Sequence, residues 1–483
     1  MAHEAVIGLE CHIQLATRSK MFCECPAEFG ASPNSNVCPV CLGLPGALPV
    51  VNRAAIDAAL QLGLVLGCTI REASVFARKN YFYPDMPKNY QITQYDRPLC
   101  EGGALPVRLC ETARSFPLIR IHVEEDTGKS FHPERTGDRP VSRVDFNRAG
   151  VPLLELVTEP AFRQPEECGA FLAGLRRLAR WLKISDGDME KGHLRCDANV
   201  SLRPPGSASL GTKTEIKNLN SIKGVEKGLT AEIARQAAVL DAGGRIEQAT
   251  LLYDADHDKL AVMRSKEYAH DYRYFPEPDL PQLTVDAAWV EEVRGRLPEP
   301  PWTREDRYVD HLGLPAYDAA ILCETRERSD YFEAVVGAGT DAKRASNWVM
   351  TEVLRHVNAR GLSEREAALR LPAKSLAVLI GATESGRITS ASAKEVLEEV
   401  FEKGGDPEAV IAARGLVARS SPEELLPLVR EVLAENPGPV AQFRGGKQAT
   451  LGFLVGQVMK KSGGRAAPQV VQELLRAELG ALR

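Results

Sequence analysis

Two pairs of cysteines near the N-terminus constrain this chain more than any other feature of its sequence. Cys23 and Cys25 form a Cys-x-Cys pair, and Cys38 and Cys41 form a Cys-x-x-Cys pair beyond a short polar loop. Each close pair lets one short turn supply two thiolates, so the four residues can close a tetrahedral shell around zinc. Two disulfides or four buried thiols are the alternatives, but free structural cysteines do not usually occur as close pairs. The spacing therefore favours a four-thiolate zinc knuckle.

The other cysteines are scattered at unpaired spacings, which is typical of a reducing compartment where thiols stay free. They are Cys11, Cys68, Cys100, Cys110, Cys168, Cys196 and Cys323. The chain starts MAHEAVIGLE, without the basic and apolar regions of a secretory signal, and no later stretch is long enough to cross a bilayer. We therefore expect a cytoplasmic protein with no membrane partner.

The length and the patterning predict several domains of two kinds. A chain of 483 residues exceeds what one hydrophobic core normally supports. Up to about Leu297, short β-type runs such as AVIGLECHIQL, PLIRIHVEE and VPLLELV alternate with turn residues. Apolar residues recur at helical spacing over 52–66 and 165–182. We expect an α+β domain over residues 1–297, with helices packed on a mixed sheet.

Beyond the proline cluster at 297–302 the composition changes to Ala, Leu, Glu and Arg. Helical periodicity appears over 329–336, 345–357, 372–381 and 392–401, and a KGGDP break follows at 403–407. Further helices are predicted over 422–435, 451–461 and 468–482. The prediction is therefore two all-helical domains, 298–405 and 406–483, after the α+β domain.

Carboxylates and histidines recur on single faces of the predicted strands. In VIGLECHIQL, Glu10 and His12 share one face while Cys11 takes the other. In IHVEED, His122 and Glu124 likewise share a face, and Glu125 takes the opposite one. Adjacent carboxylates repel one another unless a cation compensates them. Further candidates are Asp197 and Asn199 in LRCDANVSLR, and Glu215 between Lys213 and Lys217 in KTEIKNLNS.

This donor set predicts a divalent metal site. Hard oxygen ligands with one histidine suit magnesium or manganese, and magnesium suits ATP. A surface acidic loop would explain one such cluster, but not the whole set. The tripeptide Gly128-Lys129-Ser130 is not the end of a phosphate-binding loop, because position 123 is Val where that pattern needs Gly. Patterns of covalent hydrolases (G-x-S-x-G, Ser-x-x-Lys) and the zinc-protease pattern H-E-x-x-H are absent from the sequence.

Two segments mix basic and aromatic residues: RKNYFYPDMPKNYQITQYD at 78–96 and DYRYFPEPDL at 271–280. Such a mixture can hold phosphates and stack on unpaired bases, although core aromatics with solvated charges are the better explanation of any single residue. The net charge is only −5, so a nucleic acid must be met by local basic patches. Two such segments in one domain favour a nucleotide or nucleic-acid surface.

The last predicted helices carry an apolar face and basic flanks. Leu451, Leu454, Val455, Val458 and Met459 follow helical spacing and are predicted core. Glycines interleave with the candidate phosphate ligands Arg444, Lys447, Lys460, Lys461 and Arg465. A solvated helix cap with ordinary turn glycines explains the spacing equally well.

Long motifs throughout the chain resemble the GatB family, the B subunits of aspartyl/glutamyl-tRNA amidotransferases. The matching stretches are VIGLECHIQL, PGALPVVN, RKNYFYPDMPKNYQITQYD, HVEEDTGKS, VDFNRAGVPLLELVTEP, LRCDANVSLR, KTEIKNLNS, DYRYFPEPDL and GFLVGQVMK. They cover the chain from end to end.

The resemblance implies a ligase that forms a carbon–nitrogen bond with glutamine as amide donor. It implies that a catalytic "cradle" domain phosphorylates the side-chain carboxylate of Glu-tRNA(Gln) or Asp-tRNA(Asn) with ATP. Ammonia released by the GatA amidase then forms the amide, and the small GatC protein completes the complex. The misacylating synthetase is a further expected partner.

The resemblance also implies roles for individual residues. Expected magnesium ligands are Glu10, His12, Glu124, Glu125, Asp197 and Glu215, and Lys79, Arg195 and Lys217 are expected to neutralise ATP charge. Glu10, His12, Glu125, Glu215 and Lys79 are the expected catalytic residues. The cysteines match a structural zinc knuckle found in some family members, and the tail matches a tRNA-binding domain. The alternative is a non-catalytic zinc-containing tRNA scaffold; an archaeal-type paralogue (GatE) would need an inserted domain for which no stretch is long enough.

Overall fold

The computed structural model describes residues 3–109, 112–131, 141–254, 257, 259–265 and 272–481. The chain divides into two compact units, Met1–Pro300 and Pro301–Arg483. The boundary expected at Leu297 lies close to this division, whereas the further boundary at residue 405 stays a prediction. Cys110 and the last residue of the predicted helix 468–482 lie outside the described residues.

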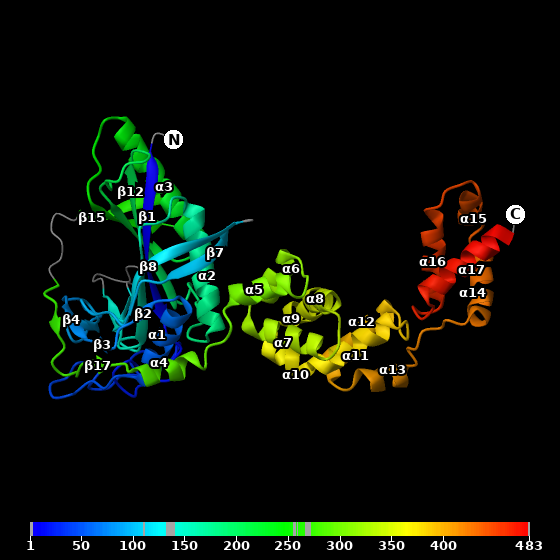
Figure 1. Ribbon diagram of the computed structural model, residues 1–483, viewed down its shortest axis with the longest axis horizontal. Helices are drawn as coiled ribbons and strands as arrows, with labels where there is room; N and C mark the ends of the chain where they lie inside the picture. Colours follow the sequence, from blue (N-terminus) through cyan, green and yellow to red (C-terminus); the bar gives the residue numbers. More distant parts are fainter. Residues whose placement is uncertain are drawn as a thin grey trace. The chain divides into compact units, whose positions relative to one another are not determined.

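The first unit is built on one large sheet with strand order β15-β14-β13-β12-β1-β11-β8-β6-β2, in which β7 also pairs with β8 (Figure 1). Neighbouring strands are antiparallel except for the parallel pair of β13 and β14. The bounds are β1 Glu4–Gln14, β2 Thr69–Ile70, β6 Cys100–Glu101, β7 Ala104–Leu109, β8 Thr112–Glu125, β11 Pro152–Thr158, β12 Leu194–Arg203, β13 Thr214–Leu219, β14 Ala249–Asp254 and β15 Lys259–Ser265.

Strand alternation decides which face of this sheet is apolar. In β1, Leu9, Cys11 and Ile13 are at most 1% exposed, while the residues between them are only partly buried. The helices α2 (Pro165–Trp181) and α3 (Ile222–Asp241) pack on each other and on the sheet. Helix α2 starts with a capping box and a proline in its first turn, and its Phe171 packs edge-to-face on Phe116. The opposite face of β1 is thereby left to polar side chains.

Smaller elements surround the sheet. The three-stranded order β16-β4-β5 joins Phe275–Pro276, Ala77–Asn80 and Tyr90–Thr93. It thus brings together the two basic and aromatic segments, which are almost 200 residues apart in sequence. The remaining elements of this unit are α1 Arg53–Val65, β3 Ala73–Ser74, β9 Lys129–Phe131, β10 Arg143–Asp145, β17 Leu283–Thr284 and α4 Ala287–Arg294.

The second unit is helical, as predicted. Its elements are α5 Pro301–Asp310, α6 Ala316–Leu322, α7 Arg326–Gly337, α8 Ala342–Trp348, the π-helical turn η1 Val349–Val353, α9 Leu354–Arg360, α10 Glu364–Arg370, α11 Ala373–Glu384, α12 Ser390–Lys403, α13 Pro407–Arg414, α14 Pro422–Glu435, α15 Pro437–Arg444, α16 Thr450–Lys461 and α17 Pro468–Ala481. The helix expected over 345–357 is divided by η1, a widened turn that periodicity alone does not reveal. Together the units confirm the α+β fold class.

Among the described residues, no helix is both long enough and apolar enough to cross a membrane.

The predicted apolar face of α16 lies in the core of the last helices. Leu451, Leu454 and Val458 are buried, and Val455 and Met459 pack against the same cluster. The cluster also takes side chains from α14 and α17, so these helices share one core. The interpretation of this face as core is confirmed.

We expect Leu454→Ala to destabilise this helical core by about 2–5 kcal/mol, because it leaves a cavity where the side chain is fully buried. Its neighbour Phe453 is 48% exposed, so Phe453→Ala should change stability by less than about 0.5 kcal/mol. Hydrogen–deuterium exchange of α14, α16 and α17 in the full chain measures both. Equal deprotection by the two variants would contradict the assigned core.

Candidate functional site

The polar face of the central sheet gathers side chains from neighbouring strands. In the antiparallel register, Glu10 of β1 lies opposite Asp197 of β12. His12 lies opposite Glu155 of β11, and Glu155 lies in turn opposite His122 of β8. Directly opposite residues of antiparallel strands point to the same side. The register therefore forms a row of ionisable groups across four strands.

Four side chains of this row and Glu124 of β8 form a compact group, which we call the His–Glu cluster: Glu10, His12, His122, Glu124 and Glu155. The Nε2 atom of His12 lies 3.6 Å from a Glu155 oxygen and 3.8 Å from oxygens of Glu10 and Glu124. The Nε2 atom of His122 lies 3.4 Å from Glu155 and 3.7 Å from Glu124. Glu155 thus lies between the two imidazoles.

Burial makes the charges of this cluster interdependent. Burial and the nearby Glu155 raise the pKa of Glu10. Burial opposes the charged form of His122, but Glu155 and Glu124 outweigh it and raise the pKa of His122 to about 9. Burial also opposes ionisation of Glu155, yet His122 and His12 hold its pKa well below the usual range. Without a metal ion, protonated histidines compensate the carboxylates.

The same donors fit a divalent cation. Glu10, His12 and Glu155 offer ligand atoms within 4.8 Å of one another, and so do His122, Glu124 and Glu155. Carboxylate oxygens are the ligands that magnesium and manganese prefer, and imidazole suits manganese better than magnesium. A bound cation would replace the protons that otherwise balance this buried charge.

Three cations border the cluster. Burial opposes the charge of Lys79 on β4, but Glu124 and other nearby groups outweigh it and raise its pKa. Lys217 of β13 makes ion pairs with Asp197 and Glu215, and Arg195 of β12 donates to Asp126 at 2.9 Å. All three residues expected to neutralise ATP charge therefore carry positive charge close to the polar face.

The structure brings together only part of the expected magnesium shell. Glu10, His12 and Glu124 meet in the His–Glu cluster. Asp197 lies beside Glu10 in the register, and it shares Lys217 with Glu215. Their roles as ligands stay predictions.

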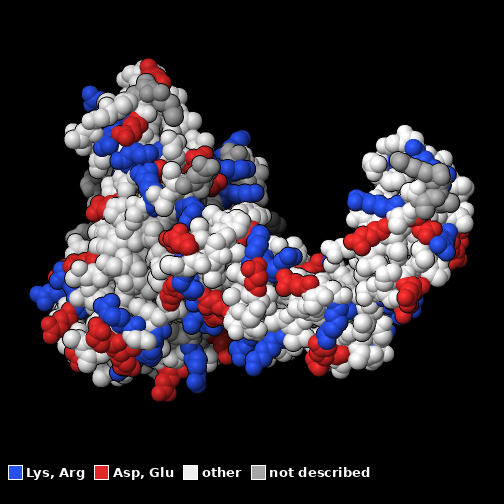
Figure 2. All heavy atoms as spheres, turned by 45° about the vertical axis from the view of Figure 1, so that its right-hand side comes forward, with Lys and Arg blue, Asp and Glu red and all other residues white. Residues whose placement is uncertain are grey.

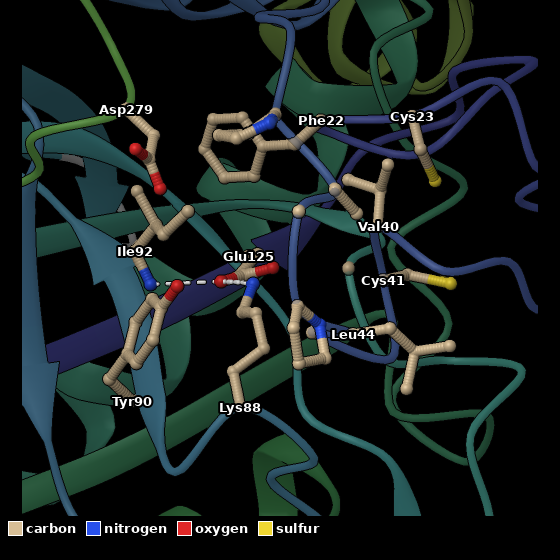
Figure 3. Close-up of a pocket in the computed structure, with 16 residues that line it drawn as sticks. Phe22, Cys23, Val40, Cys41, Leu44, Lys88, Tyr90, Ile92, Glu125 and Asp279 are labelled. Atoms are coloured by element: carbon tan, nitrogen blue, oxygen red, sulfur yellow. Dashed lines mark hydrogen bonds and ion pairs between the residues drawn. The ribbon is translucent and has the colours of Figure 1, made fainter.

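Glu125 does not take part in the contacts of this cluster, and its grouping with Glu10 and His12 in one metal shell stays a prediction. It follows Glu124 in β8, and successive side chains of a strand point to opposite faces. Its carboxylate makes an ion pair with Lys88 and accepts the Ile92 N–H at 2.9 Å (Figure 3). It lines a cavity of about 190 Å³ beside the cysteine site, with Phe22, Cys41 and Gly150 among its walls. A catalytic role for Glu125 stays a prediction, at a different place from the cluster.

Sequence reasoning missed the central residue, Glu155, and left His122 out of the candidate ligands. Glu155 lies in VPLLELV, which is typical of a buried strand, and it is only 5% exposed. A carboxylate inside such an apolar run must find a partner, since charged side chains are almost never fully buried unpaired. The single carboxylate in this apolar run was therefore the sequence signal that could have identified Glu155.

The four paired cysteines meet as predicted. Their sulfur atoms lie within 4.8 Å of one another. A tetrahedron with zinc–sulfur bonds of about 2.3 Å has edges of about 3.8 Å, so the group fits zinc. Hydrogen bonding from the Cys23 thiol, helped by the Cys38 N–H and by Lys20, lowers the pKa of Cys41 to about 4. These contacts favour the metal-binding thiolate form of Cys41. The hydrogen bond with Cys41 in turn raises the pKa of Cys23, and burial raises the pKa of Cys25 to about 11.

Aromatic rings of the two basic and aromatic segments form a shelf next to Lys79, which we call the tyrosine shelf: Tyr81, Tyr95, Tyr272 and Tyr274. Tyr95 and Tyr274 stack with ring centres 4.0 Å apart and planes 7° from parallel. Tyr272 makes edge contacts with Tyr81 and Tyr274, and Lys79 Nζ lies 5.1 Å from its ring centre. Tyr95 remains 58% exposed. The shelf is therefore open to a stacking ligand.

The five cations predicted in the tail differ in their surroundings. Arg444, Lys447 and Lys460 are exposed. Lys461 makes ion pairs with Glu431 and Glu435, and Arg465 donates to the Gly415 carbonyl at 3.3 Å. On the face drawn in Figure 2, basic and acidic side chains are interspersed. On this face, a polyanion would therefore meet small local groups of cations.

Comparison with known proteins identifies the family. A family model described as the GatB/GatE catalytic domain matches residues 5–291, and one described as the GatB domain matches residues 330–479. The B subunit of the aspartyl/glutamyl-tRNA(Asn/Gln) amidotransferase of Moorella thermoacetica is 50% identical over 479 residues, covering 99% of this chain and all of the relative. The corresponding proteins of Carboxydothermus hydrogenoformans and Anaeromyxobacter dehalogenans are each 48% identical and cover 99% of both chains. The chain belongs to the GatB family, the B subunits of the aspartyl/glutamyl-tRNA amidotransferases.

Proposed function

We propose that the first unit of this chain phosphorylates the side-chain carboxylate of Glu-tRNA(Gln), Asp-tRNA(Asn) or both, and then amidates it. A carboxylate oxygen of the aminoacyl group attacks the γ-phosphorus of ATP, and ADP leaves. Ammonia then attacks the acyl carbon, and inorganic phosphate leaves with the bonding electrons. The His–Glu cluster with its flanking cations is the observation that carries this proposal.

The chemistry explains why such a site is needed. ATP and the substrate carboxylate are both anions, and only metal ions and basic groups can bring them together. Glu10, His12, Glu124 and Glu155 would hold Mg²⁺, which supplies charge neutralisation on the phosphates when bound. Lys79, Arg195 and Lys217 would orient the transferred phosphoryl group and the substrate carboxylate through their fixed positive charges.

The tyrosine shelf supports an RNA substrate at the same place. Single-stranded RNA ends are recognised by stacking unpaired bases on aromatic rings beside cations. The shelf lies next to Lys79, whose charge is stabilised chiefly by Glu124 of the cluster. An unpaired acceptor end stacked there would bring its esterified amino acid towards the metal ligands.

The other expected components follow from family membership. We propose that ammonia comes from the GatA amidase, that GatC completes the complex, and that the complex works in the cytoplasm with the misacylating synthetase as a further partner. The four cysteines would hold zinc in a structural role, since all four ligand positions of a tetrahedral site are filled by protein.

A non-catalytic tRNA scaffold is the second candidate, because the exposed tail cations alone would serve it. Buried carboxylates argue against it: Glu124 and Glu155 are 2% and 5% exposed, and a surface that only binds RNA gains nothing from them.

Glu124 and Glu125, the two neighbouring carboxylates of β8, are expected to contribute differently to metal binding. We expect Glu124→Gln to weaken Mn²⁺ binding by about 10-fold or more, because it removes a ligand from the cluster. Glu125→Gln should leave the Mn²⁺ affinity within about twofold, since its side chain points to the other face. Electron paramagnetic resonance titration measures free Mn²⁺ directly. Loss of binding in Glu125→Gln alone would contradict the assigned cluster.

Substitution of Glu155 gives the most direct test of the proposed activity. In the complex with GatA and GatC, Glu155→Gln should lower ATP-dependent amide formation from ammonium chloride by about 100-fold or more, with glutamine hydrolysis retained. Glu159→Gln, an exposed residue just beyond the same strand, is the matched control. Assays on Glu-tRNA(Gln) and Asp-tRNA(Asn) give the substrate range. Normal amide formation by Glu155→Gln would leave the scaffold candidate standing.

The tail cations are tested by salt dependence. Replacing Arg444, Lys447 and Lys460 with Gln should weaken tRNA binding and lower the slope of log affinity against log salt by up to about 2–3. Lys461→Gln should change the slope little, because that lysine is already paired with Glu431 and Glu435. Fluorescence anisotropy with labelled tRNA at several salt concentrations measures both. An unchanged slope in the triple variant would remove the tail from the RNA surface.

A further inference from the structure

A fully buried lysine, Lys20, lies between the four-cysteine site and the loop of residues 146–150. Its side chain is 0% exposed. The ammonium donates to the Asn36 carbonyl at 2.7 Å, to the Phe146 carbonyl at 3.3 Å and to Cys41 Sγ at 3.6 Å. Within the described ranges, no carboxylate makes an ion pair with it.

Burying an ammonium group without a counter-ion costs folding free energy, so Lys20 needs a negatively charged partner. Among the described residues that Lys20 contacts, only Cys41, through its Sγ atom, can carry a full negative charge. Four thiolates around a divalent cation leave a net charge of −2 in a site where Cys41 is buried and the other three cysteines are partly buried. The positive charge of Lys20 and the negative charge of the metal-loaded cysteines therefore compensate each other.

We infer that Lys20 is the buried counter-cation of the four-cysteine metal centre, and that through it metal loading holds the 146–150 loop in place. This rests on the proposed zinc site, but it assigns a positioning role to a residue outside the ligand set. The two carbonyls orient the ammonium, and the thiolate supplies the charge that keeps it buried.

The loop connects this lysine to the polar face. Met21 N–H donates to the Gly150 carbonyl at 2.7 Å, and Gly150 N–H donates to the Asp126 carbonyl at 2.9 Å. A Cβ on Gly150 would lie 3.5 Å from Lys20 Cδ and 3.4 Å from Cys41 Cβ, so the loop packs directly on the metal site. These contacts form a continuous path from the cysteines to Asp126.

Asp126 connects this loop to the candidate site. Its carboxylate lies 3.6 Å from Arg148 Nε of the same loop and accepts from Arg195 at 2.9 Å. Arg148 also donates to the Thr127 carbonyl at 2.9 Å. If the loop shifts when the metal is lost, Asp126 would therefore be disturbed. Asp126 is the ion-pair partner of Arg195, and Arg195 is one of the cations beside the His–Glu cluster.

The first test measures metal retention in the full chain within its complex, for wild type, Lys20→Met, Lys20→Gln, Lys20→Arg and the exposed control Lys227→Met. Zinc content is measured by atomic emission, and zinc affinity by competition with a chromogenic chelator. We expect the two neutral variants to bind zinc about 10–100-fold more weakly, with Lys20→Arg and Lys227→Met closer to wild type. Wild-type affinity in both neutral variants would overturn the inference. Wild type without zinc would instead overturn the proposed zinc site.

The second test needs no variant. Removing zinc from the wild-type complex with a chelator should increase hydrogen–deuterium exchange over residues 141–151, while the core strand β12 stays protected. Restoring Zn²⁺ should restore the protection. If the loop keeps its protection in the metal-free protein, the coupling of metal to loop is overturned even where the Lys20 variants fail to fold.

Discussion

The pairing of β1 with β11 and β12 is the constraint on which the rest of the first unit depends. Because each strand alternates its side chains, this pairing sends Leu9, Cys11 and Ile13 to the helix-covered face and Glu10 and His12 to the other. A slip of one residue would exchange the two faces. The hydrophobic core and the candidate metal site are thus two results of a single register.

The same alternation separates two polar sites on β8. Glu124 joins the His–Glu cluster, whereas Glu125 turns to the cavity beside the cysteines, where Lys88 balances its charge. Two adjacent carboxylates that would repel each other in one pocket are therefore accommodated on opposite sides of the backbone. The loop of residues 146–150 contacts both sides, since Gly150 lines the cavity and Arg148 reaches Asp126. This makes the loop the connection between the four-cysteine site and the polar face that carries the His–Glu cluster.

Much of the architecture follows from local patterns. The 3.6-residue period of α2, α14 and α16 and the two-residue period of β1 are properties of short segments, so the sequence predicts these elements within a few residues. The four cysteines are close in sequence, and their site was predicted for the same reason. The widened turn η1 was not, because its register depends on packing and not on the order of residues.

The sequence by itself determined the α+β class, the helical second half, the cysteine site, and the presence of Glu10, His12 and Glu124 on strand faces, because these depend on neighbours in the chain. Only the tertiary structure decided that Glu155 lies between His12 and His122, since that contact requires the pairing of β1, β11 and β8. The burial of Lys20 against Cys41 and a distant loop was decided in the same way. Long-range register and burial are properties of the whole fold, so no local pattern of residues contains them.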